Sequence, residues 1–359
     1  MDFNDVRLRY ESLRDEIDNA IGSVLSGGRY ILGPLVETFE DEFARYCGAA
    51  RGIGVGSGTD ALKIGLRAMG VRPGDDVLVP AVSAAATGMS VAAMGARPVF
   101  VDISLDDFNI LPEQCLERKT SRTKAVIPVH LYGMPARLKE IGKAGLPILE
   151  DAAQAHGSDA SWGRCGSFGM AAAFSFYPTK NLATYGDGGI LVTSDATIAE
   201  ASRLLRNYGQ RENYSSKILG ENSRLDELHA AILRLNLRRL DEWNGRRRTI
   251  AEKYREAFRE LPVGLQAQTG KSNAHLFVVT TAHRDRFRSY LDECGVPTST
   301  HYPVPLHRQK AFAEFRPARC PNADLLCSRV LSLPMHAFLS DADVDRVIET
   351  VHEFFKRKV

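Results

Sequence analysis

FSFYPTKNL, at residues 174–182, places a lysine directly after a short apolar and aromatic run and ahead of the glycine-rich turn GDGG at residues 186–189. We expect a lysine in this setting to be held in place and partly desolvated. Desolvation disfavours the ammonium form, so the amine of Lys180 becomes a nucleophile toward carbonyl groups. Most lysines lie on protein surfaces. Taken alone, Lys180 also fits a surface position, so its assignment to an active site depends on the other motifs of the chain.

A carboxylate follows a second apolar run. The sequence EDAAQ at residues 150–154 comes directly after LPIL at residues 146–149, so we expect Asp151 at the end of a buried strand. A lysine that forms a Schiff base and an aspartate that faces a pyridinium nitrogen are the working pair of a pyridoxal phosphate (PLP) enzyme. Asp151 also fits a helix N-cap or a buried ion pair. Gln154 fits either a contact with the cofactor ring or a structural hydrogen bond.

A third motif, GVGSGT at residues 54–59, precedes a predicted helix. Glycines let backbone N–H groups approach a phosphate closely, and the N-terminus of a helix adds a favourable dipole. In isolation the motif is more typical of an ordinary loop with a Ser or Thr cap. In combination with Lys180 and Asp151, we interpret it as the phosphate clamp.

Short strands and helices alternate after residue 51. Strands are predicted at residues 77–79, 98–103, 125–128, 148–149, 172–176 and 190–193, and helices at residues 60–69, 84–94, 138–144 and 198–206. This alternation indicates a largely parallel sheet with helices on both faces, in which ligands bind beyond the carboxyl ends of the strands. Asp151 and Lys180 both follow predicted strands and therefore meet this rule.

The chain is predicted to form two domains. Helices are expected at residues 9–25, from Pro34 onward, and over a long stretch at about 225–261. The last part restarts with a strand at residues 276–280 and helices at 284–294 and 341–356. We place the boundary near residue 250, with a large domain at residues 1–250 and a smaller one at 251–359.

The composition limits the functional classes. A chain of 359 residues is long enough for two domains with a sizeable core, and a net charge of +2 gives no basis for nucleic-acid binding. No apolar stretch approaches the roughly 20 residues of a membrane span, and no signal peptide is visible, so we expect a cytoplasmic protein without membrane partners. The six cysteines are scattered without a Cys-x-x-Cys pair, which favours free thiols over a metal site.

These motifs belong to a series of stretches that runs through the whole chain. The series is YILGP at 30–34, GSGTDAL at 56–62, PVHLYG at 128–133, EDAAQAHG at 150–157, SFYPTKNL at 175–182, GDGG at 186–189 and NSRLDE at 222–227. In these residues and their order the chain resembles the DegT/DnrJ/EryC1/StrS family of sugar aminotransferases. The resemblance implies an α/β protein of the aspartate-aminotransferase fold (fold type I). Its large domain would hold a mixed, mostly parallel seven-stranded sheet, and its smaller C-terminal domain would be α+β.

The resemblance also implies how a cofactor is held. Lys180 would bind PLP covalently, Asp151 would pair with its pyridinium nitrogen, and Gln154 would contact its ring hydroxyl. The phosphate would be bound by three residues, Gly58, Thr59 and Ser175. Asn222 would reach the phosphate of the cofactor in a neighbouring subunit, so the active unit would be a homodimer with shared sites.

Substrates follow from the same resemblance. In the family, L-glutamate usually donates the amine and a nucleotide-linked keto sugar accepts it. NSRLDE at residues 222–227 is similar to enzymes that aminate the 3-position, whereas enzymes acting at the 4-position more often carry Asn-Tyr-Arg-Met there. We therefore favour a dTDP-linked 3-keto-6-deoxyhexose, with Tyr177 and His301 lining the hexose. The alternatives are a UDP-linked 3-keto sugar or sugar acid, a 4-keto sugar and, outside enzymes, a PLP-binding regulatory protein.

One position departs from the family pattern. The segment PAVSAAAT at residues 80–87 has Ala84 where the family usually has an aromatic residue stacked on the cofactor ring. Loss of a stacked ring removes about 0.5–1.5 kcal/mol of contact beyond the area that it buries. We expect either another side chain to cover this face or a more loosely held cofactor. Lys180 itself separates the chain from the family's dehydratases, which have a histidine there.

Overall fold

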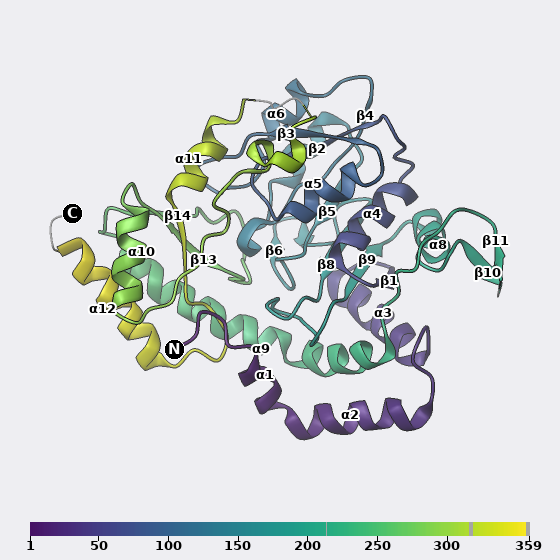
Figure 1. The fold of residues 1–359 in the computed structure, drawn as a ribbon, viewed down its shortest axis with the longest axis horizontal. Helices are drawn as coiled ribbons and strands as arrows, with labels where there is room; N and C mark the ends of the chain where they lie inside the picture. The colour runs from purple at the N-terminus through teal and green to yellow at the C-terminus, as the bar shows by residue number, and fades with distance from the viewer. Residues whose placement is uncertain (213, 316–318, 357–359) are drawn as a thin grey trace.

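A central sheet organises the larger part of the computed structural model, which describes residues 1–212, 214–315 and 319–356 (Figure 1). One run of its strands has the order β1 (Arg51–Val55), β9 (Gly189–Thr193), β8 (Ala171–Ser175) and β5 (Leu149–Asp151). A second run has the order β3 (Arg97–Val101), β2 (Asp76–Pro80) and β4 (Thr123–Val126). Parallel bridges from Val126 to Ile148 and from Val129 to Asp151 join the two runs between β4 and β5. The described strands thus form the order β1-β9-β8-β5-β4-β2-β3.

This sheet is mixed, as the family resemblance implies. β9 pairs antiparallel with both of its neighbours, whereas β8 and β5, β2 and β4, and β2 and β3 pair in parallel. Parallel strands place their carboxyl ends at one edge of a sheet. Asp151, at the end of β5, and Ser175, at the end of β8, therefore lie at the same edge.

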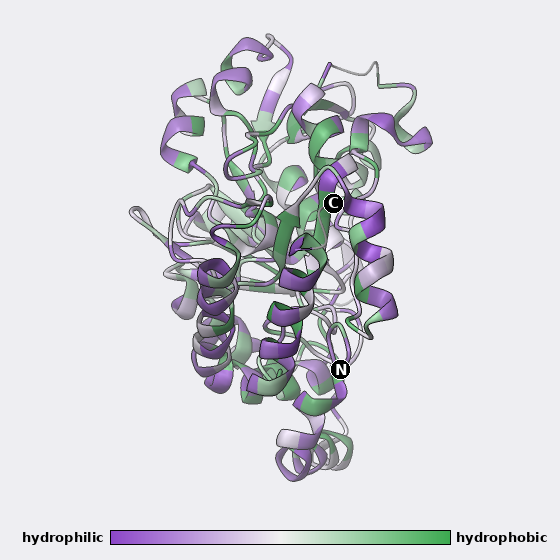
Figure 2. Cartoon of the chain, turned by 90° about the vertical axis from the view of Figure 1, so that its left-hand side faces the viewer, coloured by the Kyte–Doolittle hydropathy of each residue, from purple (hydrophilic) through white to green (hydrophobic). Residues whose placement is uncertain are grey.

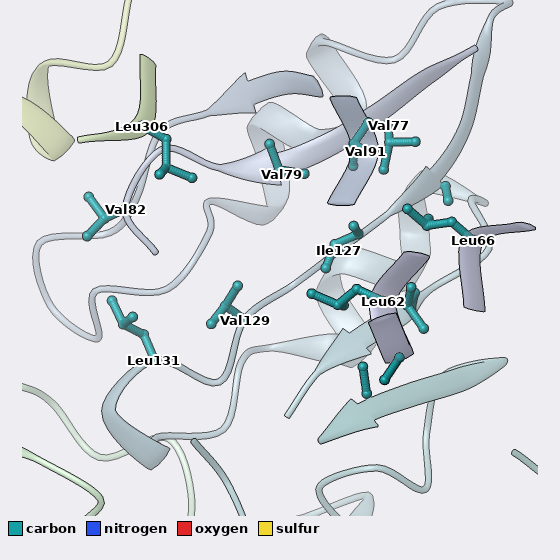
Figure 3. Packing of buried hydrophobic residues seen from close by; sticks show 14 of the residues in the cluster. Leu62, Leu66, Val77, Val79, Val82, Val91, Ile127, Val129, Leu131 and Leu306 are labelled. Carbon is teal, nitrogen blue, oxygen red and sulfur yellow. The ribbon is translucent and has the colours of Figure 1, made fainter. Parts of the chain in front are cut away.

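Helices cover both faces of the sheet, which explains why most residues of its strands are buried. On one face, α4 (Gly58–Ala68) and α5 (Ala85–Ala92) pack on the strands, and Figure 3 shows Leu62 and Leu66 of α4 among Val77 and Val79 of β2. On the other face lie α3 (Pro34–Cys47) and the start of α9 (Glu227–Phe258). There Phe43 of α3 meets Phe174 of β8 edge to face, with 4.9 Å between the ring centroids. Figure 2 shows the hydrophobic strands inside and the hydrophilic helix faces outside.

The C-terminal part has a sheet and a core of its own. The strands β12 (Gly264–Leu265), β13 (Phe277–Thr280) and β14 (Val330–Leu333) are antiparallel. The helices of this part are α10 (Arg284–Glu293), α11 (Pro321–Arg329) and α12 (Asp341–Lys356). α9 contributes Leu233 to the core under the large sheet and Tyr254 to the C-terminal core, and it crosses residue 250 without interruption. The domain boundary near residue 250 stays a prediction.

Several elements differ from the expectation. The helix predicted at residues 9–25 is interrupted at Leu13, giving α1 (Arg7–Ser12) and α2 (Arg14–Gly27). β1 was not expected, because its sequence RGIGV alternates glycine with apolar residues and lacks an apolar run. The helix predicted at residues 138–144 continues after α7 (Leu138–Ile141) as a 3-10 turn. Further elements are α6 (Pro112–Glu117), α8 (Ala196–Leu205), β6 (Asp159–Ala160), β7 (Gly163–Arg164), β10 (Gln210–Glu212) and β11 (Ser215–Ser216).

Within the described residues, none of the helices is both long and apolar enough to cross a membrane. The same part of the chain holds no group of three or more His, Cys, Asp or Glu side chains arranged to bind a metal ion. All six cysteines are free thiols, and Cys294 is the half-buried one among otherwise buried residues.

Candidate active site

A pocket of about 240 Å³ opens at the carboxyl edge of the large sheet. Its lining includes seven of the predicted site residues, namely Gly58, Thr59, Asp151, Gln154, Ser175, Tyr177 and Lys180. The remaining lining residues are Ser57, Leu62, Ser83, Ala84, Ala86, Ala153 and Asp187. Segments separated by more than a hundred residues thus converge where the strand order predicts a ligand. Asn222 and His301 do not belong to this lining.

Lys180 lies in the loop that follows β8. Its backbone N–H donates to the carbonyl of Tyr177 at 2.9 Å, and its carbonyl accepts a hydrogen bond from the guanidinium of Arg9 at 2.8 Å. Burial lowers the pKa of the Lys180 amine to about 8, against an opposing contribution from the charge of Asp151. An appreciable fraction of the amine is therefore neutral, and hence nucleophilic, near neutral pH.

Asp151 is a buried carboxylate, with 5% of its surface exposed. Its Oδ2 accepts a hydrogen bond from the Thr87 hydroxyl at 2.7 Å, and its Oδ1 accepts one from the N–H of Ala153 at 3.2 Å. Burial raises the pKa of Asp151, while these hydrogen bonds and the charge of Lys180 act in the opposite direction. The hydroxyl of Ser83 lies 2.7 Å from that of Thr87. Thr87 and Ser83 were given no role from the sequence, although both lie in the segment that contains Ala84.

Gln154 has both ends of its side-chain amide engaged. Its Oε1 accepts a hydrogen bond from the N–H of Tyr132 at 2.6 Å, and its Nε2 donates to the hydroxyl of Tyr302 at 3.1 Å. These contacts are the structural hydrogen bonds that the sequence left as an alternative, and the contact with a ring hydroxyl stays a prediction. Tyr302 was missed, although it belongs to the histidine- and proline-rich loop around His301.

His301 is half-buried beside the pocket. Its Nδ1 lies 2.9 Å from the hydroxyl of Ser332, and its carbonyl accepts a hydrogen bond from the Tyr132 hydroxyl. Burial, reinforced by the charge of Lys180, lowers the pKa of His301 to about 4. We therefore expect a neutral imidazole at physiological pH. Its contact with a hexose stays a prediction, as does that of Tyr177, which is 52% exposed at the pocket mouth.

The predicted phosphate clamp lies at the N-terminus of α4. Ser57 caps the helix through its Oγ, which accepts a hydrogen bond from the N–H of Asp60 at 3.1 Å. A Cβ atom on Gly58 would lie 2.6 Å from the Cβ of Ser175, so a larger residue cannot occupy position 58 without displacing the end of β8. The first N–H groups of a helix have no partner within it. The turn at Gly58 and Thr59 therefore presents backbone donors and a positive dipole end to the pocket.

Asn222 is exposed and lies outside the pocket lining, and no hydrogen bond of its side chain is found within the described part of the chain. Its neighbour Ser223 is buried and accepts a hydrogen bond from the N–H of Gly56 at 2.9 Å. The same hydroxyl donates to Oδ2 of Asp60 at 2.9 Å. Neither Asn222 nor Ser223 caps α9, since Asp226 occupies the N-cap position. The role of Asn222 in a neighbouring subunit stays a prediction.

The residues present fit a pyridoxal phosphate. The pocket combines a nucleophilic amine on Lys180, a buried carboxylate on Asp151 that can pair with a protonated ring nitrogen, and a helix N-terminus that favours a phosphate. The close approach of Gly58 to Ser175 leaves this end of the pocket to backbone donors. Ala84 also lines the pocket, and among the described lining residues Tyr177 is the aromatic one.

Comparison with known proteins agrees with this geometry. The model of the DegT/DnrJ/EryC1/StrS aminotransferase family matches residues 11–352. A dTDP-3-amino-3,4,6-trideoxy-alpha-D-glucose transaminase from Streptomyces venezuelae is 46% identical over 99% of this chain and 96% of its own length. A dTDP-3-amino-3,6-dideoxy-alpha-D-galactopyranose transaminase from Aneurinibacillus thermoaerophilus is 43% identical over 99% of this chain and 98% of its own.

A solved structure is similar over the full length. The crystal structure of S. venezuelae DesV in complex with a ketimine intermediate has a TM-score of 0.97 and 45% sequence identity, and the match covers 100% of this chain and 99% of that one. The likeness thus includes both the large sheet and the C-terminal sheet. The chain belongs to the DegT/DnrJ/EryC1/StrS aminotransferase family.

Proposed function

We propose that this protein transfers the amino group of L-glutamate to the 3-keto group of a dTDP-linked 6-deoxyhexose, with PLP as cofactor and 2-oxoglutarate as the second product. The observation that carries the proposal is the pocket in which Lys180, Asp151 and the N-terminus of α4 converge. The choice of a dTDP-linked 3-amino sugar rests on the two transaminases that are 46% and 43% identical to the chain over nearly its whole length.

Each residue of the pocket has a distinct task in this proposal. Bound PLP would supply an electron sink that stabilises negative charge at the carbon next to the amine. Asp151 would pair with the protonated ring nitrogen, and Thr87 orients the Asp151 carboxylate. Lys180 would hold the cofactor. Once its amine is released, it would take the proton from the α-carbon of glutamate and later return a proton to C3 of the sugar, as general base and acid. A pKa of about 8 suits both directions of transfer near neutral pH.

The proposal includes a homodimer in which Asn222 completes the phosphate site of the neighbouring subunit. Its exposed position supports this role, because the side chain is free to meet another chain. Ser223 holds the adjoining backbone against the phosphate turn of its own subunit through Gly56 and Asp60. The segment thus lies beside its own clamp and remains available to a partner.

The absorbance spectrum of the purified protein, before and after addition of L-glutamate, tests the proposal. We expect the visible band of a lysine-bound cofactor, its conversion to the amine form by glutamate, and its return on addition of a dTDP-3-keto-6-deoxyhexose. Lys180→Ala is the control, and it is expected to lose both the band and turnover. A cofactor band with no response to glutamate favours the regulatory alternative. Turnover with a UDP-linked 3-keto sugar or a 4-keto sugar alone would reassign the acceptor.

A further inference from the structure

A second pocket, of about 180 Å³, lies between α9 and the segment that leads into β13. From α9 it is lined by Arg248, Ala251, Glu252 and Arg255, and from the facing segment by residues between Gln266 and Phe277, including Lys271. Arg248, Glu252 and Arg255 follow a spacing of four and three residues, which places them on one face of the helix. The two pockets share no lining residue, so this one is separate from the candidate active site.

Three positively charged side chains line this pocket, those of Arg248, Arg255 and Lys271, and none of them forms an ion pair among the described residues. Other arginines of the same helix are paired, as Arg234 is with Glu42 at 2.7 Å and Arg246 with Asp341 at 3.0 Å. Among the described residues, no ion pair or side-chain hydrogen bond joins Arg248, Arg255 or Lys271 to any carboxylate. Glu252 is the one carboxylate of the lining. Three cations and one carboxylate leave a formal charge of +2 around the cavity.

Part of the positive charge that lines the pocket is buried, because the side chain of Arg255 is partly enclosed by the protein. Its Nε is buried and has no hydrogen-bond acceptor in the described structure. Its guanidinium lies 5.9 Å from the centre of the Phe277 ring, and burial lowers its pKa. An unsatisfied buried donor is unfavourable, and a hydrogen bond to a charged acceptor is among the stronger ones available to it. An anion in the pocket would supply that acceptor.

We propose that the pocket between α9 and the segment ahead of β13 binds a small dianion. A phosphate monoester and a short dicarboxylate share the required chemistry, which is two negative charges and several acceptor oxygens matched to Arg248, Arg255 and Lys271. The dianion would join α9 to the facing segment and stabilise the folded state by an amount that grows with the logarithm of its concentration once the site is largely occupied. This assignment does not depend on the proposed aminotransfer.

Calorimetric titration of the PLP-loaded protein with inorganic phosphate, and separately with succinate, tests the proposal at constant ionic strength. We expect one saturable site per chain for at least one of the two probes. Lys271→Gln and Arg248→Gln each remove one charge from exposed or half-buried positions and should weaken binding by about tenfold. Glu252→Gln should strengthen it, because it removes the one opposing charge. Arg286→Gln, on α10 outside the pocket lining, is the matched control and should leave the affinity unchanged.

The two probes identify the source of the dianion. Saturation by phosphate alone indicates a phosphate ester, and saturation by succinate alone indicates a dicarboxylate. The proposal is overturned if neither probe saturates, or if Lys271→Gln, Glu252→Gln and Arg286→Gln bind alike. Arg255→Gln is judged by its thermal unfolding midpoint with and without the probe, since this half-buried side chain also packs on Phe277. Loss of the rise in that midpoint is expected.

Discussion

The hydroxyl of Thr87 donates a hydrogen bond of 2.7 Å to the carboxylate of Asp151. We predict that Thr87→Val, which keeps the shape and removes the hydroxyl, raises the pKa of Asp151 further, because burial already raises it and Thr87 is the foremost opposing hydrogen bond. A charge-assisted hydrogen bond contributes about 1.5–3 kcal/mol, so aminotransferase kcat should fall roughly 10- to 100-fold. The measurement is kcat against pH. Thr87→Ser restores the donor and should behave as wild type, and an unaltered pH profile in Thr87→Val would contradict the assignment.

The amine of Lys180 should be visible in the pH dependence of cofactor binding. Its pKa is lowered to about 8 by burial, so the neutral, nucleophilic form accumulates as pH rises through that value. In cofactor-free protein, we predict that the rate of PLP uptake increases up to about pH 8 and then levels off. An unperturbed lysine would still be gaining neutral amine near pH 10. Stopped-flow absorbance measures the rate, and a profile that keeps rising well above pH 9 would refute the lowered pKa.

The same lowered pKa has a consequence for stability whose sign can be stated. Between about pH 8 and the ordinary range of lysine, the unfolded chain binds more protons at position 180 than the folded one. The contribution of Lys180 to the free energy of unfolding of the cofactor-free protein therefore rises with pH in that window. Below about pH 8 both states are protonated and this contribution is constant.

Single residues also show what the sequence could and could not predict about the site. The presence of Lys180, Asp151 and Gly58 in one pocket was predictable, because each belongs to a contiguous motif whose chemistry is visible locally. Thr87 and Tyr302 were not, since their roles arise only when α5 and the loop near residue 301 are placed against Asp151 and Gln154. A hydroxyl in an alanine-rich segment carries no local signal of its partner.

At the scale of elements, Glu227 joins the beginning of α9 to the beginning of α3. Its carboxylate accepts hydrogen bonds from the N–H groups of Gly33, Leu35 and Val36 at 2.9, 3.1 and 2.8 Å, and thus satisfies donors at the start of α3. A negative charge at this position is also favoured by the helix dipole. Both elements form the face of the large sheet that carries Phe43.

We predict that Glu227→Gln destabilises the protein. The amide offers one acceptor oxygen in place of two and points an N–H group toward other donors, so the free energy of unfolding should fall by about 1–3 kcal/mol. Urea unfolding of the cofactor-loaded protein measures the change. Glu256→Gln, at an exposed position on the same helix where the carboxylate pairs with Arg259, should change it by less than about 0.5 kcal/mol. Equal effects of the two substitutions would show that the buried carboxylate is not needed.

The elements also mark the limits of prediction from sequence. The strands β2, β3, β4, β8 and β9 were expected within a few residues, because strands that are buried on both faces carry short apolar runs. β1 was missed because its two glycines obscure the apolar pattern of a strand. The structure requires glycine there, since a Cβ atom at Gly52 would meet the backbone of Glu40 and one at Gly54 would meet the side chain of Leu225. The interruption at Leu13 has no local sequence signal, and Leu13 is buried with Ile232 and Trp243 of α9. Leu13 thus packs against a helix that is distant in the sequence, and such a contact is not visible in the local residues.

For the whole molecule, the shared-site arrangement can be tested with two inactive proteins. Lys180→Ala lacks the amine, and Asn222→Ala lacks the contact proposed to reach the neighbouring subunit. A mixed dimer of the two contains one site with both residues intact if Asn222 acts across the interface. We predict that unfolding and refolding the two proteins together restores aminotransferase activity, up to about a quarter of the wild-type level. Each variant refolded alone is the control, and no recovery in the mixture would place Asn222 in its own subunit's site or outside any site.

The hydroxyl of Ser223 has a further consequence. It binds the backbone of Gly56 and the carboxylate of Asp60, so the segment proposed to meet a second subunit and the turn proposed to hold phosphate are fixed to each other. Two binding events that order the same short piece of backbone are thermodynamically linked, and each lowers the cost of the other. Association of the subunits and occupancy of the cofactor site should therefore rise and fall together, so that cofactor starvation loosens the assembly before it unfolds the chain.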